Sequence, residues 1–305
     1  MTYTLDSIPD LTGKITVITG ANAGLGFETS LALAARGAHV IMAARNHDKA
    51  SVAAQRIRTS TPNASVEVVE LDLASLASVR AAAARISADH ARVDILVNNA
   101  GVMALPEGRT TDGFETQFGV NHLGHWALTA HLMPAILASA AARVVTVTST
   151  AHHFARAVNP TNPHLSGAYS PWKAYGQAKL ANYHFALGLQ REFVQAGVSA
   201  MSLLAHPGAS NTELGTHTAE YGGLGALSTF LISAAGRMGQ SAEHGAMPQL
   251  RAATDPAATG GEFYAPRRVN TGVPVRRPVM RRGSSKAITD LWLISERETG
   301  IPMKV

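Results

Sequence analysis

Tyr175 and Lys179 stand four residues apart, a spacing that places a phenol and an ammonium group on one face of a helix. Ser170 and Pro171 are residue types typical of a helix N-cap and first turn, so the sequence predicts that this helix begins here. A free phenol titrates near pH ~10, and a nearby cation favours the phenolate. We therefore predict that Lys179 lowers the pKa of Tyr175, and that Tyr175 exchanges a proton with a carbonyl or alcohol oxygen.

Tyr169 and Lys173 share the same spacing, but they lie on either side of Pro171. Because Pro171 marks the expected start of the helix, Tyr169 should lie outside it and its position relative to Lys173 is not fixed. We therefore expect proton transfer at the later pair only.

The composition limits the classes of function. The chain of 305 residues has no cysteine, which excludes disulfides, thiolate nucleophiles and cysteine-based metal sites. No basic start followed by an apolar run is visible at the N-terminus, and no stretch approaches ~18 apolar residues. We therefore expect a cytoplasmic protein without a membrane span.

The net charge of +5 is concentrated in a basic segment, residues 267–286, which holds seven positive charges and no acid. This segment lacks the interleaved aromatic residues and motifs of nucleic-acid binding. We expect a solvated face, or a surface that attracts an anionic cofactor, and no nucleic-acid partner.

Short β-branched runs alternate with alanine-rich amphipathic stretches along the chain. The runs predict strands at 15–19, 39–43, 66–71, 93–97, 144–148, 198–205 and 261–265. The stretches predict a first helix that ends near residue 36 and further helices at 48–58, 76–86, 114–138, 171–195 and 287–298. Strands separated by helices, each strand apolar on both faces, are typical of a covered parallel sheet. We predict an α/β fold, a Rossmann-type doubly wound parallel sheet with helices on both faces, as one domain over 1–305, with residues 211–239 as a substrate lid.

Gly20, Gly24 and Gly26 lie between the first predicted strand and the first predicted helix. Glycines at this place let the backbone approach a pyrophosphate whose charge rests on the helix N-terminus. A tight strand-helix turn without a ligand is the alternative, but the context favours a dinucleotide site.

The end of the second strand should select the cofactor. An acid there accepts the ribose hydroxyls of NAD, whereas a base accepts the additional phosphate of NADP. The chain has Arg45 and no acid at this place. We predict NADP(H) in preference to NAD(H); an exposed arginine at the start of a loop is the alternative.

Together these stretches resemble the short-chain dehydrogenase/reductase family, in its order and spacing and over almost the whole chain. The matching motifs are Thr19-Gly20-x3-Gly24-x-Gly26, Asp72, Asn98-Asn99-Ala100-Gly101, Asn121, Ser149, Tyr175-x3-Lys179 and Pro207-Gly208. Finer features are similar to the branch of retinol dehydrogenases and WW-domain oxidoreductases, namely Ala44-Arg45-Asn46, Asn121-His122-Leu123-Gly124-His125-Trp126 and His206-Pro207-Gly208. Membrane-bound members of that branch carry an N-terminal anchor; none is visible here, so we expect a soluble protein of the bacterial type.

The resemblance implies a role for each matching residue. Tyr175 would be the general acid/base, Lys179 would hold the nicotinamide ribose, Ser149 would donate a hydrogen bond to the reacting oxygen, and Asn121 would support a proton-relay water. The cofactor would be bound by Gly20, Asn22, Gly24, Leu25, Gly26, Arg45, Asp72, Leu73, Asn98, Ala100, Tyr175, Lys179, Pro207, Gly208 and Thr212. Of these, Asp72 and Leu73 would meet the adenine, Asn98 and Ala100 the adenosine ribose, and Pro207, Gly208 and Thr212 the nicotinamide. The resemblance is compatible with a homo-oligomer.

Two assignments depend on the context of the residues. Thr148, Ser149 and Thr150 all carry hydroxyls, so a shift of one residue would move the assignment; Ser149 is favoured because Ala151 and His152 follow it at the offset seen in the branch. The histidines at 122, 125, 152, 153 and 164 form no metal-binding motif, and we predict no metal site.

The function that these observations favour is hydride transfer between NADP(H) and a lipophilic ketone or aldehyde, or the corresponding alcohol. The apolar stretch 224–232 favours a lipophilic substrate. A non-catalytic NAD(P)-sensing protein is the alternative from another class. An epimerase or dehydratase that uses bound NAD(P) is the alternative among enzymes, although those relatives usually have a larger C-terminal substrate domain.

Overall fold

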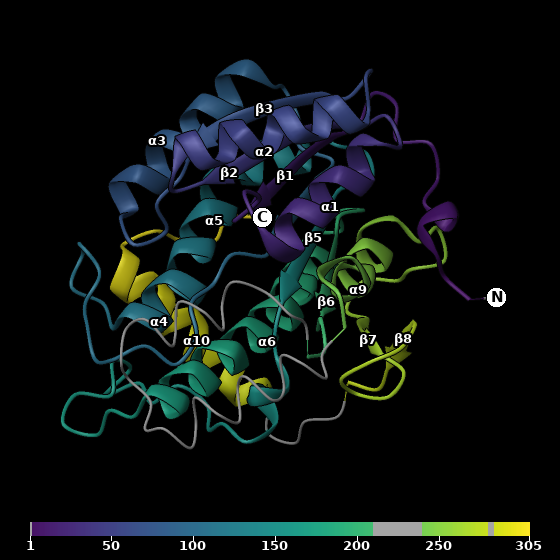
Figure 1. The fold of residues 1–305 in the computed structure, drawn as a ribbon. Coiled ribbons are helices and arrows are strands. Elements are labelled where there is room, and N and C mark those ends of the chain that lie inside the picture. The colour runs from purple at the N-terminus through teal and green to yellow at the C-terminus, as the bar shows by residue number, and fades with distance from the viewer. Residues whose placement is uncertain (1, 210–239, 280–283) are drawn as a thin grey trace.

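An eight-stranded sheet lies at the centre of the computed structural model, which describes residues 2–209, 240–279 and 284–305 (Figure 1). Its order is β3-β2-β1-β4-β5-β6-β7-β8. The strands are β1 (Ile15–Thr19), β2 (His39–Ala44), β3 (Ser65–Glu70), β4 (Ile95–Asn98), β5 (Arg143–Val147), β6 (Met201–Ala205), β7 (Phe263–Pro266) and β8 (Pro274–Arg277). Strands β1 to β7 pair in parallel, and β8 pairs antiparallel with β7. The predicted Rossmann-type fold is confirmed.

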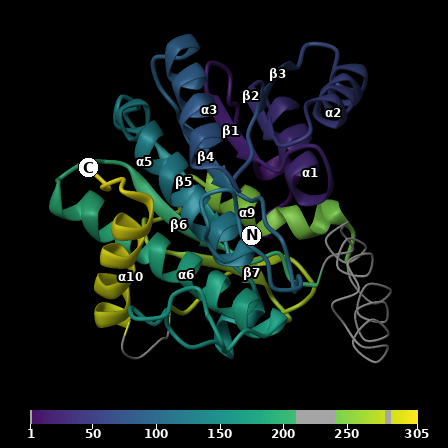
Figure 2. The same cartoon turned by 90° about the vertical axis from the view of Figure 1, so that its left-hand side faces the viewer.

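Helices cover both faces of the sheet, which is why the central strands are apolar on both sides (Figure 2). On one face lie α1 (Gly24–Ala34), α2 (His47–Ser60) and α9 (Ala242–Thr254). On the other face lie α3 (Leu76–Asp89), α5 (Gly124–Leu137) and α6 (Pro171–Gln195), and α10 (Ser284–Thr299) packs on α6. Short turns of helix complete the fold at Leu5–Ser7, Thr116–Phe118, Gly119–Leu123 and Thr150–His153.

Helix α6 begins at Pro171 and ends at Gln195, as the sequence predicts. Ser170 occupies the N-cap position in an extended conformation, although its side chain makes no capping hydrogen bond. Tyr169 therefore lies outside the helix, where its hydroxyl donates to the carbonyl of Leu105 at 2.7 Å. The nearby Lys173 Nζ donates to the carbonyl of Ala168, so this second pair does not bring its phenol and ammonium together in one site.

Three elements differ from the sequence prediction. The helix predicted over 114–138 is interrupted, because Gly119–Leu123 winds as a π-helix between α4 (Thr116–Phe118) and α5. Helix α9 and strand β8 were not predicted at all. The substrate lid at 211–239 and Thr212 lie outside the described residues.

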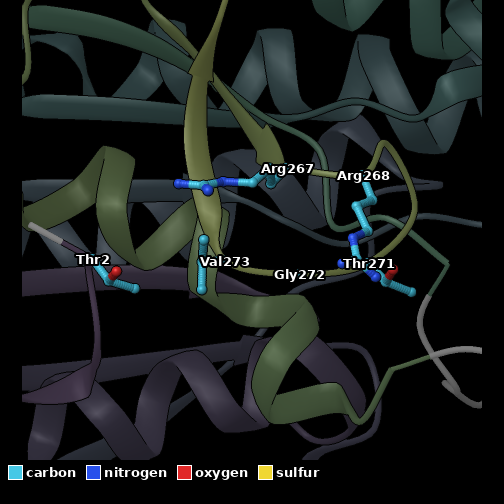
Figure 3. A pocket seen from close by; sticks show the side chains of 6 residues that line it. All are labelled: Thr2, Arg267, Arg268, Thr271, Gly272 and Val273. Atoms are coloured by element: carbon cyan, nitrogen blue, oxygen red, sulfur yellow. The ribbon is translucent and has the colours of Figure 1, made fainter.

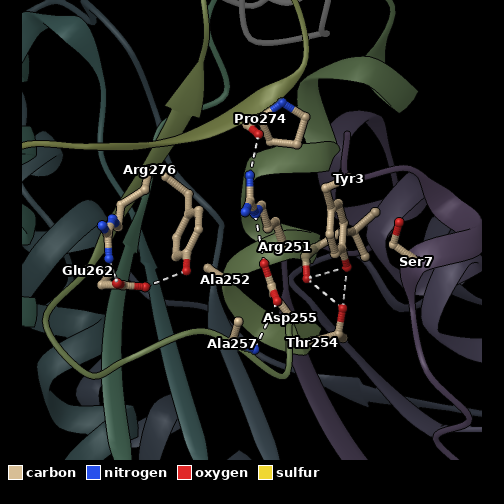
Figure 4. Close-up of polar contacts among 12 residues, drawn as sticks. Tyr3, Ser7, Arg251, Ala252, Thr254, Asp255, Ala257, Glu262, Pro274 and Arg276 are labelled. Atoms are coloured by element: carbon tan, nitrogen blue, oxygen red, sulfur yellow. Dashed lines mark hydrogen bonds and ion pairs between the residues drawn. The ribbon is translucent and has the colours of Figure 1, made fainter. Parts of the chain in front are cut away.

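Ion pairs and hydrogen bonds anchor the C-terminal part of the sheet (Figure 4). Arg276 Nη1 lies 2.7 Å from Glu262 Oε1, and Arg251 Nε lies 2.9 Å from Asp255 Oδ2. Arg277 donates to the main-chain carbonyl of Pro266 at 3.0 Å. Part of the basic segment 267–286 therefore stabilises the β7–β8 hairpin.

Arg267 and Arg268 in the same segment are exposed. They line a surface pocket of about 320 Å³ together with Thr2, Thr271, Gly272 and Val273 (Figure 3). This pocket contains none of the predicted catalytic residues. Within the described ranges, each helix is too short or too polar to cross a lipid bilayer.

Candidate active site

Most of the predicted site residues lie where the carboxyl ends of β1, β4, β5 and β6 meet the first turns of α1 and α6, and Arg45, Asp72 and Leu73 follow β2 and β3. Strand order reverses between β1 and β4, whose neighbours β2 and β5 lie on opposite sides. A doubly wound sheet opens a crevice at such a point, outside the carboxyl ends of its strands. The topology therefore brings Gly20, Ala100, Ser149 and Pro207 to one edge of the sheet.

The Ser149 hydroxyl lies close enough to the Tyr175 phenol to lower the pKa of that phenol. Ser149 is the second residue after β5, and Tyr175 lies in the second turn of α6, with only 6% of its surface exposed. The neighbouring Thr148 donates its hydroxyl to the carbonyl of Lys179 at 2.7 Å, so that hydroxyl serves the packing of β5 against α6. Of the residues considered for this role, Ser149 is the one that the fold brings to the phenol.

Burial changes the pKa of both members of the Tyr175–Lys179 pair. It raises the pKa of Tyr175 above 10.0, and the nearby Ser149 hydroxyl opposes this rise only in part. It lowers the pKa of Lys179 to about 8. Lys179 Nζ lies 5.8 Å from the centroid of the Tyr175 ring. The predicted lowering of the Tyr175 pKa is wrong for this structure, because loss of hydration is the largest influence on that pKa and raises it.

Lys179 Nζ is buried close to the loop that follows β4. It donates to the carbonyl of Val147 at 3.3 Å, its one hydrogen bond among the described residues. A Cβ atom added at Gly101 would lie 3.3 Å from this Nζ and 3.0 Å from Asn121 Oδ1. The ammonium thus retains donors that face the loop at Gly101.

Asn121 is held by the π-helix Gly119–Leu123 and fixes the loop after β4. Its Oδ1 accepts from the Val102 N–H at 2.7 Å, and its Nδ2 donates to the Val102 carbonyl at 2.9 Å. Its side chain is fully buried. Asn121 therefore supports the loop that lies against Lys179.

His125 links Asn121 to Thr19 at the end of β1, a connection that the sequence analysis missed. Burial lowers the pKa of His125 to about 4, so the ring is neutral near pH 7. Its Nδ1 donates to the Asn121 carbonyl at 2.9 Å, and its Nε2 accepts from the Thr19 hydroxyl at 2.8 Å. Thr19 Oγ1 also accepts from the main-chain N–H groups of Asn99 and Ala100. The only signal in the sequence was the spacing of His125, four residues after Asn121.

The glycine turn is closed by contacts that leave no room for side chains. Gly20 has a φ of +65°, which favours glycine, and a Cβ added there would lie 3.0 Å from Ala100 Cβ. A Cβ at Gly26 would lie 2.3 Å from the Gly20 carbonyl oxygen. Asn99 Nδ2 donates to the Thr19 carbonyl at 2.8 Å and holds the turn from the other side. The first turn of α1 is thereby presented at the end of β1, with Asn22, Gly24 and Leu25 partly exposed.

Arg45 and Asp72 lie at the ends of neighbouring strands. Arg45 is exposed after β2, and among the described residues it forms no hydrogen bond or ion pair. Asp72 follows β3 and accepts from the Ala74 N–H at 2.9 Å, which shapes the turn before α3. Leu73, next to it, is buried against Gly124.

Asn98 is placed differently from Ala100. The whole of Asn98 is buried, and its Nδ2 donates to Thr129 Oγ1 at 3.2 Å, which ties β4 to α5. Ala100 is partly exposed and borders the glycine turn. The geometry therefore supports a ligand contact at Ala100 and a packing role at Asn98.

Pro207 and Gly208 turn the chain after β6. Gly208 has a φ of +76°, and the Asn270 carbonyl lies so close that an added Cβ would approach it to 2.3 Å. Gln240 Nε2 donates to the Pro207 carbonyl at 2.8 Å. The β7–β8 hairpin and the start of α9 thus position this turn.

Comparisons with known proteins give the same picture as the geometry. The sequence model of the family described as short chain dehydrogenase matches residues 14–221. The chain belongs to the short-chain dehydrogenase/reductase family. Retinol dehydrogenase 13 of Homo sapiens is 39% identical over 295 residues, which cover 95% of this chain and 85% of that protein. Retinol dehydrogenase 11 of Homo sapiens is 40% identical over 243 residues, which cover 80% and 76%.

Solved structures of bacterial proteins share the fold. The structure of an uncharacterized protein from Mycobacterium paratuberculosis has a TM-score of 0.80 at 38% identity and covers 100% of both chains. RhlG of Pseudomonas aeruginosa, in an active-site complex with NADP, has a TM-score of 0.64 at 26% identity and covers 83% of this chain and 94% of that chain. The predicted membership of the retinol-dehydrogenase-like branch is confirmed.

The described residues fit the nicotinamide dinucleotide that short-chain dehydrogenases bind. The glycine turn offers the first turn of α1 to a phosphate. Among the residues that the structure describes, Arg45 offers a guanidinium without a hydrogen bond or ion pair, and Lys179 offers a buried ammonium with one hydrogen bond. These groups lie along the carboxyl edge of the sheet, from β2 to β5.

Proposed function

We propose that this oxidoreductase interconverts a lipophilic ketone or aldehyde and its alcohol with NADP(H), and that Tyr175 is the general acid/base. The observation that carries the proposal is the Tyr175 phenol, buried beside the Ser149 hydroxyl, with the Lys179 ammonium one helical turn away. A cofactor-sensing protein needs no such group. The alternative of a non-catalytic NAD(P) sensor is thus the weaker one.

The bound nicotinamide would supply or accept the hydride. Tyr175 is neutral at pH 7, as a phenol with a pKa near ~10 already is, and burial reinforces this state. It donates its proton to the oxygen of a carbonyl under reduction. Ser149 donates a hydrogen bond to the same oxygen as negative charge develops on it. Lys179 places a positive charge beside the phenolate that remains, and Asn121 holds the loop against which Lys179 rests.

The cofactor would follow the edge of the sheet. Its pyrophosphate would rest on the glycine turn and its nicotinamide ribose on Lys179, with the ring beside Pro207 and Gly208. Arg45 would bind the 2′-phosphate of NADP(H) through charge-assisted hydrogen bonds. The NADP complex of the related RhlG is consistent with this preference.

The substrate class is inferred from apolar side chains near the catalytic phenol. Trp172 is 43% exposed, and its ring lies edge-on to that of Tyr175 with centroids 6.0 Å apart. Phe154, at the end of the short turn that begins after Ser149, is 91% exposed. An exposed aromatic ring beside a reactive group, as Trp172 is beside Tyr175, favours an apolar substrate. The similarity to proteins named retinol dehydrogenases points to the same class.

The test is a panel of hydrophobic ketones and aldehydes, followed by NADPH oxidation. We expect turnover that increases with the apolar surface of the substrate and is faster with NADPH than with NADH. Binding of NADPH without turnover of any member of a broad panel would instead support the sensor.

A further inference from the structure

His39, Glu67 and His90 meet at the edge of the sheet opposite the active site. His39 is the first residue of β2, Glu67 lies in β3, and His90 follows the last residue of α3. In the parallel register His39 pairs with Ser65, so Glu67, two residues further, projects on the same face as His39. Helix α3 packs on this face and brings His90 to it. Two of the three residues thus sit on paired strands, which hold them rigidly.

The three side chains present nitrogen and oxygen atoms at distances that suit one cation. Glu67 Oε1 lies 2.8 Å from His90 Nε2 and 3.6 Å from His39 Nε2, and the three atoms lie within 4.8 Å of one another. Zinc binds such atoms at about 2.0–2.2 Å, so that ligands of one tetrahedral ion lie roughly 3.3–3.5 Å apart. A small side-chain movement would bring all three to these values.

His39 Nε2 is the atom that most needs a partner. It is buried and forms no hydrogen bond among the described residues. The Nδ1 atom of the same ring lies 2.7 Å from Ser65 Oγ. A proton on Nδ1, donated to Ser65, leaves the lone pair of Nε2 directed toward the Glu67 carboxylate, and two such electron-rich atoms repel unless a cation lies between them. Fixing the tautomer through the other ring nitrogen is typical of metal-binding histidines.

We propose that His39, Glu67 and His90 bind one divalent transition-metal ion of the zinc class. Two imidazoles and a carboxylate favour such an ion over Mg²⁺ or Ca²⁺, which prefer oxygen ligands. The ion fastens the edge strand β3 and the end of α3 to β2. It lies at the amino ends of the strands, whereas Ser149 and Tyr175 lie at the carboxyl edge, so it stabilises the fold and takes no part in hydride transfer. This proposal departs from the sequence prediction of no metal site, because the three residues are distant in sequence and form no motif.

Tag-free protein, stripped with a chelator, is titrated with Zn²⁺ at pH 7.5 by calorimetry. We expect one ion per chain with a Kd in the micromolar range or below, a rise in Tm of a few degrees at saturating zinc, and neither effect with Mg²⁺. His39→Gln, Glu67→Gln and His90→Gln should each weaken zinc binding at least tenfold. His47→Gln, which removes an exposed histidine in the first turn of α2, should not change it.

No zinc binding by the wild-type protein, or equal binding by the wild type and the three cluster variants, would overturn the proposal. It is also overturned if His90→Gln lowers the Tm equally in chelator and in zinc, because the cluster is then only an ion pair. The Tm of each variant in chelator shows whether it folds. Cobalt replacement in the wild-type protein needs no variant: an intense visible absorption band supports a site of low coordination number, and a weak band typical of the hydrated ion contradicts it.

Discussion

Tyr175 and Lys179 show at the residue scale how burial sets the chemistry of a pair that the sequence only locates. Both lose hydration inside the protein, and both therefore favour their neutral forms. The spacing of four residues predicts that the two side chains share a face. It does not predict burial, which depends on the packing of α6 on β5, and so the direction of the Tyr175 pKa was predicted wrongly.

The lowered pKa of Lys179 makes the stability of the protein depend on pH. Below pH 8 the lysine is charged in both states, and the folded protein carries a buried charge. Between pH 8 and about 10.5 the folded state releases this proton before the unfolded state does, so the free energy of unfolding rises with pH. In the wild type this rise amounts to up to ~3 kcal/mol. We expect the free energy of unfolding of Lys179→Met to lack it.

Urea unfolding of both proteins at pH 7.5, 9 and 10 measures the difference. The free energies of unfolding of wild type and Lys179→Met should converge or cross as pH increases. Parallel curves over this range would show that Lys179 has an ordinary pKa.

Arg45 carries the predicted choice of cofactor. Arg45→Asp replaces the proposed phosphate partner by an acid suited to ribose hydroxyls, so the ratio of kcat/KM for NADPH to that for NADH should fall by about 10- to 100-fold. Lys49→Asp is the matched control, because it makes the same change of charge at an exposed position in α2. If Arg45→Asp and Lys49→Asp have equal ratios of kcat/KM, the selectivity for NADPH does not come from Arg45.

At the scale of elements, the sequence predicts those that are stabilised by their own pattern. Strands β1 to β6 and helix α6 combine apolar runs with clear boundaries, and the structure has them close to the predicted positions. Helix α9 was missed because Gly245 and Pro248 look like helix breakers, although Ser241 caps the helix by accepting from the His244 N–H. Strand β8 begins with proline and carries two arginines; it is extended because β7 pairs with it.

The site residues were predictable where a sequence motif identified them. They were less predictable where contacts between distant parts of the chain place them. The sequence favours Ser149 over Thr148 by its neighbours Ala151 and His152, and the hydrogen bond from the Thr148 hydroxyl to the Lys179 carbonyl adds a physical reason. The π-helix that holds Asn121 has no periodic signature in the sequence. The contact of His125 with Thr19 joins residues 106 positions apart, a distance that no local pattern encodes.

The closed turn between β1 and α1 gives a prediction about an element. In Gly26→Ala the new methyl group collides with the Gly20 carbonyl oxygen, so the first turn of α1 must move away from β1. We expect at least a tenfold rise in the Kd of NADPH, measured by fluorescence, and a lower Tm. Ala35→Ser adds one atom at the exposed end of the same helix and should change neither. Unchanged NADPH affinity in Gly26→Ala would separate this turn from cofactor binding.

At the scale of the whole molecule, buried neutral histidines should make the fold sensitive to acid. Burial lowers the pKa of His122 and His206 to about 3 and that of His125 to about 4. Below pH ~6.5 the unfolded chain takes up protons that the folded protein excludes, so stability falls as pH falls. Each histidine contributes about 1.4 kcal/mol per pH unit, until the pH reaches its folded pKa.

Urea unfolding at pH 7, 6 and 5 should therefore show a loss of several kcal/mol. His122→Gln should flatten the dependence by roughly a third, whereas His47→Gln, at an exposed position, should leave the slope as it is. A stability that is constant between pH 7 and 5 would contradict this account of the buried histidines.

Single-turnover reduction by Tyr175→Phe, with a substrate taken from the carbonyl panel, tests the central claim most directly. This variant removes only the phenolic oxygen that Ser149 contacts, and Tyr169→Phe removes the same atom from the pair outside the site. We predict that Tyr175→Phe slows hydride transfer at least about a hundredfold and leaves the Kd of NADPH within about twofold, while Tyr169→Phe stays near the wild-type rate. A Tyr175→Phe enzyme that reduces its substrate at the wild-type rate would contradict the account.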